Sequence, residues 1–282
     1  MSRPRPRLRL LVRLLALVAG LLVLAVLVLL SCVSFERELT PEQESRVRRS
    51  TYAAPTGRVA LLAAGTEGAP RVILVHGTPG DSSDWLALLL SPPPGCELLA
   101  VDRPGFGRSE PRGAVPALHA QAEALLPLLA PRGGHWPVLV GHSLGAPIVA
   151  LLAAEHPDRV GGLLLLAGAL DPALEEWHWY NRVAGALGPL LSRPLRNSND
   201  ELRPLRSELA SLAGLLPAVR CPVVIVHGRQ DQLVPFANAA YAQRMLTGAS
   251  EVRLVDLPYG DHFLPWNAQD TLRSALASLT GR

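Results

Sequence analysis

Residues 137–146 read Pro-Val-Leu-Val-Gly-His-Ser-Leu-Gly-Ala, and this stretch decides the fold of the chain. The apolar residues before Gly141 predict a short strand, and the small residues after Leu144 predict a helix. Gly141 and Gly145 flank Ser143, and they lack the Cβ atoms that would keep strand and helix apart. A serine held at such a sharp turn is exposed for attack, so we expect Ser143 to be a nucleophile. The alternative is a serine that only caps the following helix.

Short apolar runs alternate with helix-like runs through the rest of the chain. We expect strands at residues 59–63, 72–76, 98–102, 138–141, 162–167, 223–227 and 251–255. We expect helices at residues 83–90, 117–129, 144–155, 237–246 and 267–279. Near-continuous apolar strands separated by helices are typical of a mostly parallel sheet covered on both faces. The sequence therefore predicts an α/β fold, with one domain over residues 50–282.

Residues 171–219 interrupt this alternation. Prolines at positions 189, 194, 204 and 217 divide the segment into short helices. An insertion between consecutive strands of a parallel sheet projects at the strand ends, where ligands bind in open α/β folds. We therefore expect residues 171–219 to form a short helical lid, and we call them the lid segment.

Positive charge is concentrated at the start of the chain. Five of the first 13 residues are Arg, and residues 1–31 contain no acidic side chain. The remainder has 22 Arg and 24 acidic residues, so its net charge of −2 gives no reason to expect nucleic-acid binding. Residues 14–30 carry no polar side chain, and the uncharged run continues to Phe35. An Arg-rich start before an apolar run of this length predicts a membrane-insertion segment over residues 1–31.

The end of this apolar run offers a lipidation site. Leu29-Leu30-Ser31-Cys32 resembles the lipobox of bacterial lipoproteins. The resemblance implies cleavage before Cys32 and attachment of lipid to its sulfur, with residues 32–49 left as a linker. The alternative is an uncleaved transmembrane anchor. Both interpretations place the body outside the cytoplasmic membrane and tethered to a bilayer.

Four further motifs occur in order along the body. They are His76–Gly80 (HGTPG), Asp102–Ser109 (DRPGFGRS), Gly228–Asp231 (GRQD) and Gly260–Phe263 (GDHF). Together with the serine turn, these motifs resemble those of the α/β-hydrolase family across about residues 50–282. The resemblance implies the fold of that family and a catalytic order of serine, acid and histidine. We expect the turn at Arg103 to support the structure rather than the chemistry.

A serine hydroxyl needs a neighbouring base, because it does not ionise at neutral pH. His262 follows the last predicted strand, and the resemblance assigns it the role of base. Asp231 follows the preceding strand and is assigned the role of the acid that orients the imidazole. Asp171 is the alternative acid, because some members of the family carry the acid there. His178, in the lid segment, is the alternative base.

Two backbone N–H groups are expected to stabilise the negative oxygen of a tetrahedral intermediate. One belongs to Leu144, at the start of the predicted helix. The family match assigns the second to Thr78, whose hydroxyl is a further candidate donor. Trp177, Trp179 and Tyr180 have two interpretations: they line a substrate pocket, or they pack the lid segment on the body.

These expectations describe a membrane-tethered serine esterase, of the carboxylesterase or lipase kind, that forms an acyl-Ser143 intermediate. Its substrate is a small ester or acyl compound, and the predicted chemistry needs no metal and no organic cofactor. The serine at the turn argues against the haloalkane dehalogenases and epoxide hydrolases of the family, which use Asp at that position. Amidase, peptidase and thioesterase activities use the same side chains and stay open. A non-catalytic binding or receptor protein on the same fold is the alternative of a different class.

Overall fold

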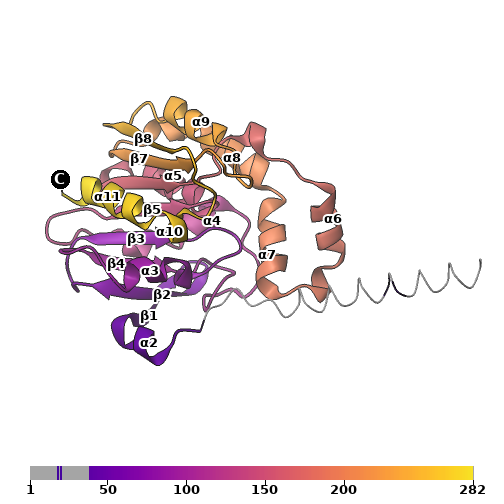
Figure 1. Ribbon diagram of the computed structural model, residues 1–282, viewed down its shortest axis with the longest axis horizontal. Helices are drawn as coiled ribbons and strands as arrows, with labels where there is room; N and C mark the ends of the chain where they lie inside the picture. Colours follow the sequence, from indigo (N-terminus) through magenta and orange to yellow (C-terminus); the bar gives the residue numbers. More distant parts are fainter. Residues whose placement is uncertain (1–17, 19, 21–37, 282) are drawn as a thin grey trace, which may run out of the picture.

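The computed structural model describes residues 18, 20 and 38–281, which include one eight-stranded sheet flanked by helices (Figure 1). The strand order is β1-β2-β4-β3-β5-β6-β7-β8. The strands are β1 Arg48–Ala54, β2 Gly57–Gly65, β3 Arg71–Val75, β4 Glu97–Val101, β5 Val138–His142, β6 Gly162–Leu166, β7 Val223–Gly228 and β8 Val252–Leu257. Only β2 runs antiparallel to its neighbours, and the other pairs in this sheet are parallel. The predicted mostly parallel sheet is confirmed.

Helices of the described chain follow most of the strands. The α-helices are α2 Pro41–Arg46, α3 Leu86–Leu89, α4 Leu118–Glu123, α5 Gly145–Glu155, α6 Trp179–Ala186, α7 Arg193–Leu202, α8 Leu205–Ala213, α9 Ala237–Met245, α10 Leu264–Asn267 and α11 Gln269–Thr280. The 3₁₀ turns are η1 Ser82–Trp85, η2 Leu126–Leu128, η3 Pro157–Arg159, η4 Pro172–Leu174, η5 Gly188–Leu190 and η6 Leu216–Ala218.

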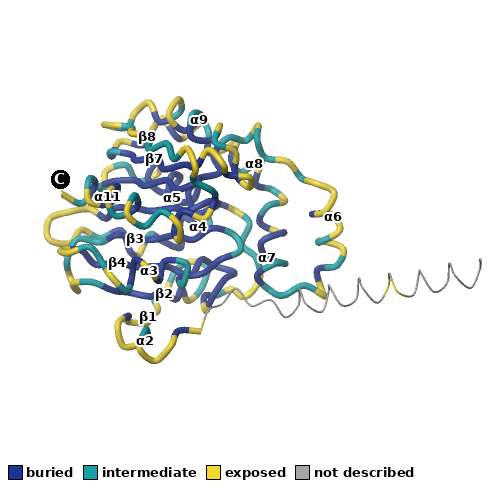
Figure 2. The backbone as a smooth tube through the Cα atoms, in the orientation of Figure 1, coloured by how far each residue is buried: buried dark blue, intermediate teal, exposed yellow. Residues whose placement is uncertain are grey.

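The core lies on both faces of the sheet. Alternate residues of β3 point to opposite faces: Ile73 and Val75 join the cluster under α4, α5, α8 and α9, whereas Val72 and Leu74 join the cluster under α3 and α11. Figure 2 shows the central strands and α5 as the most continuously buried part of the chain. Burial on both faces explains why the strands read as unbroken apolar runs rather than as alternating ones.

The seven expected strands agree with β2 to β8 to within two residues at each end, whereas β1 has no counterpart among the expected strands. The helix expected at 117–129 instead ends at Glu123 and is followed by η2, which contains Pro127. Proline has no N–H to donate to the preceding turn, so it interrupts the helix. The helix expected at 83–90 begins as η1, where the carboxylate of Asp81 accepts a hydrogen bond from the backbone N–H of Ser83 at 2.7 Å.

The folded domain begins before residue 50, inside the segment expected to be a linker. Thr40 and Gln43 form a reciprocal capping box at the start of α2. Leu39 and Val47, on either side of this helix, are buried in the core under α3 and α11. Two isolated apolar residues within a charged stretch carry no periodic signal, so the sequence pattern does not reveal that they pack.

The expectations for residues 1–31 and for Cys32 fall on positions that, apart from residues 18 and 20, lie outside the described residues. Within the described part of the chain, no helix has the length and apolar character needed to cross a bilayer. The lid segment is described, and it contains η4, α6, η5, α7, α8 and η6 between β6 and β7. Figure 1 shows α6 and α7 projecting beyond one end of the sheet.

Candidate active site

The sharp turn between β5 and α5 carries Ser143. Its φ of 53° lies in the left-handed region, which residues other than glycine rarely adopt. A Cβ at Gly141 would lie 2.4 Å from the carbonyl oxygen of Gly145, and a Cβ at Gly145 would lie 2.4 Å from the carbonyl oxygen of Val75. Only glycine fits these two positions. The backbone N–H of Ser143 donates to the carbonyl oxygen of Leu166 at 2.9 Å, which ties the turn to β6.

His262 and Asp231 meet at the carboxyl ends of β8 and β7. The Nδ1 of His262 lies 2.8 Å from Oδ2 of Asp231. The other oxygen of Asp231 accepts hydrogen bonds from the backbone N–H groups of Leu233 and Val234, at 2.9 and 2.8 Å. A carboxylate only accepts, so Nδ1 carries the proton and Nε2 keeps its lone pair. The imidazole is therefore oriented to act as a base through Nε2.

Asp231 is held in its charged form. Burial alone raises the pKa of its carboxyl group, but hydrogen bonds from His227, His262 and the backbone of Val234 outweigh burial and hold the pKa well below its usual range. The carboxylate therefore stays ionised at neutral pH. A fixed negative charge at this position stabilises the imidazolium that forms when His262 accepts a proton.

Thr78, Leu144, Ser143 and His262 line one cavity. Among residues 38–281, no group accepts a hydrogen bond from the backbone N–H of Thr78 or Leu144. Two unpaired N–H groups beside a serine are available to a negative oxygen. The side chain of Thr78 differs from expectation, because its hydroxyl donates to Glu201 at 2.8 Å. It is not available as a further donor to substrate.

The sequence profile of the alpha/beta hydrolase fold family matches residues 70–195. The chain has the α/β-hydrolase fold. The RutD protein of Klebsiella pneumoniae (strain 342), provisionally named a carbamate hydrolase, is 26% identical to this chain over 255 residues. The aligned region covers 78% of this chain and 94% of RutD. Lipase LipV of Mycobacterium tuberculosis is 32% identical over 183 residues, which is 64% of each chain.

Solved structures show the same fold. The crystal structure of a bacterial membrane phospholipase A superposes on this α/β-hydrolase with a TM-score of 0.61 at 22% identity. The superposition covers 99% of this chain and 100% of that one. At this level of identity the similarity establishes the architecture of the α/β-hydrolase domain.

Two cavities meet at the serine of this α/β-hydrolase. One of about 470 Å³ lies under the lid segment, and one of about 370 Å³ is lined by the loop at Thr78 and by Trp266. Ser143 and His262 line both. The reacting atoms would thus have space for a substrate on either side. In the part of the chain that the structure describes, no group of three or more His, Cys, Asp or Glu side chains is arranged to hold a metal ion.

The three lid aromatics do not share one environment. Trp177 and Tyr180 line the larger cavity. Trp179 does not, and 74% of its surface is exposed. His178 also lines this cavity, with its Nδ1 3.8 Å from a carboxylate oxygen of Glu176, whereas the hydrogen bond to Asp231 comes from His262.

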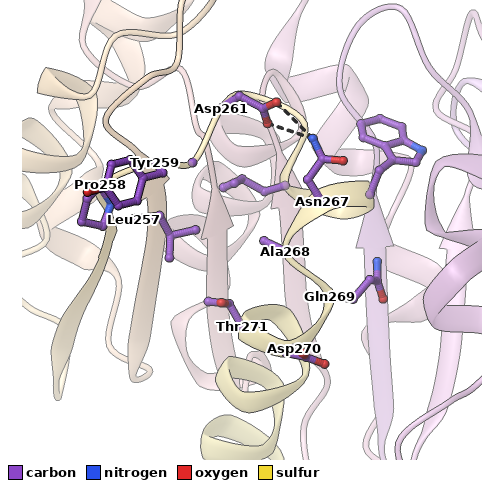
Figure 3. A pocket seen from close by; sticks show the side chains of 12 residues that line it. Leu257, Pro258, Tyr259, Asp261, Asn267, Ala268, Gln269, Asp270 and Thr271 are labelled. Atoms are coloured by element: carbon purple, nitrogen blue, oxygen red, sulfur yellow. Dashed lines mark hydrogen bonds between the residues drawn. The ribbon is translucent and has the colours of Figure 1, made fainter.

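The alternative acid Asp171 and the nearby Asp261 both have other partners. Asp171 accepts a hydrogen bond from the backbone N–H of Ala173 at 2.9 Å and caps η4. Figure 3 shows Asp261 turned toward Asn267, whose amide nitrogen lies 3.0 and 3.2 Å from the two carboxylate oxygens. This pair lines a cavity of about 560 Å³ that contains none of the three expected catalytic side chains. Asp231 is therefore the carboxylate that the structure brings to His262.

His142 supports the loop of His262 from the core. Its Nε2 lies 2.9 Å from the carbonyl oxygen of His262. A carbonyl only accepts, so His142 donates through Nε2. Burial, with a smaller contribution from His262, lowers the pKa of His142 to about 3. The ring is therefore neutral at physiological pH.

We expect His142→Gln to reduce the sensitivity of folding to acid. Below a pKa of about 6.5, the unfolded chain binds a proton at His142 that the folded chain binds only near pH 3, so folding is disfavoured as pH falls. The contribution is about 1.4 kcal/mol per pH unit within this window. Urea unfolding at pH 6.5 and 4.5 should show the wild type losing about 2–3 kcal/mol more than the variant. Equal losses in the two proteins would contradict this assignment.

Two residues near the site carry no signal in the sequence. Glu201, on α7, is fully buried and contacts Thr78 across 123 positions of chain. Asp84 lines the smaller cavity, and burial together with the charge of Asp81 raises the pKa of its carboxyl group well above the ordinary value. Both lie in stretches without a motif, so only the fold shows that they are near Ser143.

Proposed function

We propose that this α/β-hydrolase cleaves carboxylic esters through an acyl intermediate on Ser143. The observation that carries the proposal is the 2.8 Å hydrogen bond from His262 to Asp231, formed at the cavity that also holds the serine and two unpaired N–H groups. Nucleophile, oriented base, buried carboxylate and oxyanion donors together form the set that acyl transfer requires. A pure binding protein needs no such set.

The mechanism follows from these positions. Nε2 of His262 accepts the hydroxyl proton as Oγ of Ser143 attacks the ester carbonyl carbon. The resulting oxyanion accepts hydrogen bonds from the N–H groups of Thr78 and Leu144. The imidazolium then gives its proton to the leaving alcohol as the C–O bond breaks. Water repeats the sequence on the acyl-serine: its proton goes to His262, and the serine leaves with that proton as the acid is released.

Ester cleavage is tested against its alternatives with one set of substrates. Lipase LipV is named for ester chemistry, whereas the name of RutD places C–N cleavage among the alternatives. We expect the purified full chain to hydrolyse a p-nitrophenyl ester with kcat/KM at least about 100-fold above that for the matched p-nitroanilide or alkyl thioester. We also expect it to be labelled by a fluorophosphonate. A chain that neither labels nor hydrolyses any of the three substrates favours the non-catalytic binding protein.

We further propose that the substrate is a lipid ester reached at a membrane surface. The support is the inverted pattern of α6 and α7 in the lid segment, which bury mainly polar residues, while α6 exposes apolar ones. Asn181 of α6 is buried and donates to the side chain of Asn199 of α7 at 3.2 Å. The outward residues Trp179 and Val183 are 74% and 46% exposed. A helix that packs on a protein core has the opposite pattern, and one that lies in a membrane interface has this one.

Charge and composition point to a bilayer rather than to a protein partner. Trp179 and Tyr180 are the side chains that favour the membrane interface, and Arg182 provides a cation on the same helix. Leu190, 50% exposed in η5, is a further exposed apolar residue of the lid segment. The apolar run at residues 14–30, if it inserts as proposed, would hold the body at a bilayer.

We expect Trp179 to be quenched by bromine atoms in a bilayer. The full chain is reconstituted in vesicles of brominated phosphatidylcholine, and its fluorescence is compared with that of Trp179→Phe and of Trp136→Phe. Trp136 is exposed but precedes β5, so it lies at the end of the sheet opposite Ser143. Quenching should fall in Trp179→Phe and persist in Trp136→Phe. Equal quenching in the two variants would show that Trp179 of the lid segment does not enter the membrane.

The tether itself is proposed from the sequence alone. A mature N-terminus at a lipid-modified Cys32 would support the lipoprotein, and mass spectrometry of the protein from membranes measures it directly. A chain that starts at Met1 or Ser2 would instead establish the uncleaved anchor. Recovery of the whole protein in the soluble fraction contradicts both.

A further inference from the structure

A buried carboxylate of the lid segment reaches the loop that carries the proposed oxyanion donor. Glu201 is 1% exposed, and four hydrogen bonds converge on its two oxygens. Arg103 donates through both terminal nitrogens, at 2.7 and 3.1 Å. Gln121 donates at 2.9 Å, and the hydroxyl of Thr78 donates at 2.8 Å. One side chain of α7 thus joins the oxyanion loop to two other parts of the body.

Arg103 uses its remaining donors on the backbone of the same loop. Its Nε donates to the carbonyl oxygen of His76 at 3.0 Å, and Nη2 donates to that of Gly77 at 2.9 Å. The guanidinium is 1% exposed, so these bonds form away from water. The expectation that this turn supports the structure agrees with these contacts, and the supported element is the oxyanion loop.

His76 adds a second bond to the carbonyl of Gly77. The backbone N–H of Arg103 donates to Nε2 of His76 at 3.0 Å, so this nitrogen is the acceptor and Nδ1 carries the proton. Nδ1 then donates to the carbonyl oxygen of Gly77 at 2.7 Å. Burial, followed by the charge of Arg103, keeps the pKa of His76 well below its ordinary value, so this tautomer stays neutral.

These bonds decide where the N–H of Thr78 points. The Gly77–Thr78 peptide is not among the cis bonds of the described chain, so its C=O and N–H point in opposite directions. Arg103 and His76 hold the carbonyl toward the body, which turns the N–H of Thr78 the other way. A Cβ at Gly77 would lie 2.8 Å from the Cβ of Ser143, so this peptide passes directly beside the serine.

We propose that Glu201 and Arg103 are positioning residues of the oxyanion hole, and that the lid segment completes the hole through Glu201. This inference rests on the proposed serine hydrolase function. Arg103 fixes the peptide plane through Gly77, and Glu201 fixes Arg103 and the side chain of Thr78 together. The lid segment therefore contributes to the rate of acyl transfer as well as to substrate binding.

The test separates a misplaced oxyanion donor from a general loss of structure. Glu201→Gln keeps the shape of the side chain but removes its charge, and we expect kcat to fall by about 10- to 100-fold with KM within about threefold of wild type. Glu208→Gln is the matched control. Glu208, on α8, joins the lid segment to the body by accepting from the backbone N–H of Leu118 at 2.9 Å, without touching the loop. Its kcat should stay within about twofold of wild type.

A thionoester analogue reports on the hole itself, because sulfur accepts hydrogen bonds from the oxyanion donors poorly. The ratio of ester to thionoester rates should be large in wild type and in Glu208→Gln, and should shrink in Glu201→Gln. An unchanged ratio in Glu201→Gln overturns the proposal, as does an unchanged kcat. A wild type that hydrolyses no ester would instead overturn the proposed function.

A second pair of variants covers the case in which Glu201→Gln fails to fold. Thr78→Val removes the hydroxyl and leaves the ion pair of Arg103 with Glu201 in place. We expect it to lower kcat by about 3- to 10-fold and to reduce the thionoester ratio, with Thr78→Ser recovering most of both. Equal values for the valine and serine variants would show that the bond to Glu201 does not position the loop.

Discussion

Replacing Ser143 by alanine is expected to lower kcat for ester hydrolysis by about 10⁴- to 10⁶-fold. Alanine removes the atom that attacks the carbonyl carbon, and no other described serine lines the cavities that His262 lines. What remains is the rate that the oxyanion donors and substrate binding give to direct attack by water. The measurement is hydrolysis of a p-nitrophenyl ester, together with labelling of the purified full chain by a fluorophosphonate.

The matched control for this substitution is Ser211→Ala. Ser211 lies exposed on α8, where its hydroxyl donates to the carbonyl oxygen of Ser207 at 3.1 Å. The Ser211→Ala variant should be labelled by the fluorophosphonate and should hydrolyse the p-nitrophenyl ester as the wild type does. Labelling that persists in Ser143→Ala would place the nucleophile elsewhere and contradict the mechanism.

Asp231→Asn is expected to lower kcat by about 10⁴-fold at neutral pH. The amide preserves size but can donate a hydrogen bond to Nδ1 of His262, which shifts the imidazole proton to Nε2. The base then faces Ser143 with a proton where a lone pair is needed. The charge that stabilises the imidazolium is lost in the same step.

Asp171→Asn is the control, since Asp171 is the alternative acid and its carboxylate caps η4 instead of reaching His262. It should keep kcat within about twofold of wild type. The comparison is made between pH 6 and 9, a range in which the depressed pKa of Asp231 leaves it ionised throughout. A larger loss in Asp171→Asn than in Asp231→Asn would reverse the assignment.

The sequence predicts the parts of this molecule that depend on local chemistry. The serine turn can be predicted from the sequence because strand and helix approach so closely that only glycine fits at positions 141 and 145. The sheet can be predicted from the sequence because strands buried on both faces are continuously apolar. His262 was expected because it follows the last strand, where the carboxyl ends of parallel strands converge.

Features that depend on packing between residues far apart in the sequence cannot be predicted in the same way. Asp171 and Asp231 both follow strands, and only their surroundings separate a turn cap from a partner of His262. The hydroxyl of Thr78 is a candidate donor to substrate from the sequence, but in the structure it donates a hydrogen bond to Glu201 instead. A glutamate in an unremarkable helical stretch gives no local sign that it will be buried against Arg103.

The proposed base depends on the least protected strand that leads into the site. β8 is at the edge of the sheet and pairs only with β7, and its residues are at best half-buried, whereas those of β7 are fully buried. Edge elements open locally at a lower free-energy cost than a core does. Heating is therefore expected to inactivate the protein before it melts: β8 can detach and carry His262 away from a serine turn that is still intact.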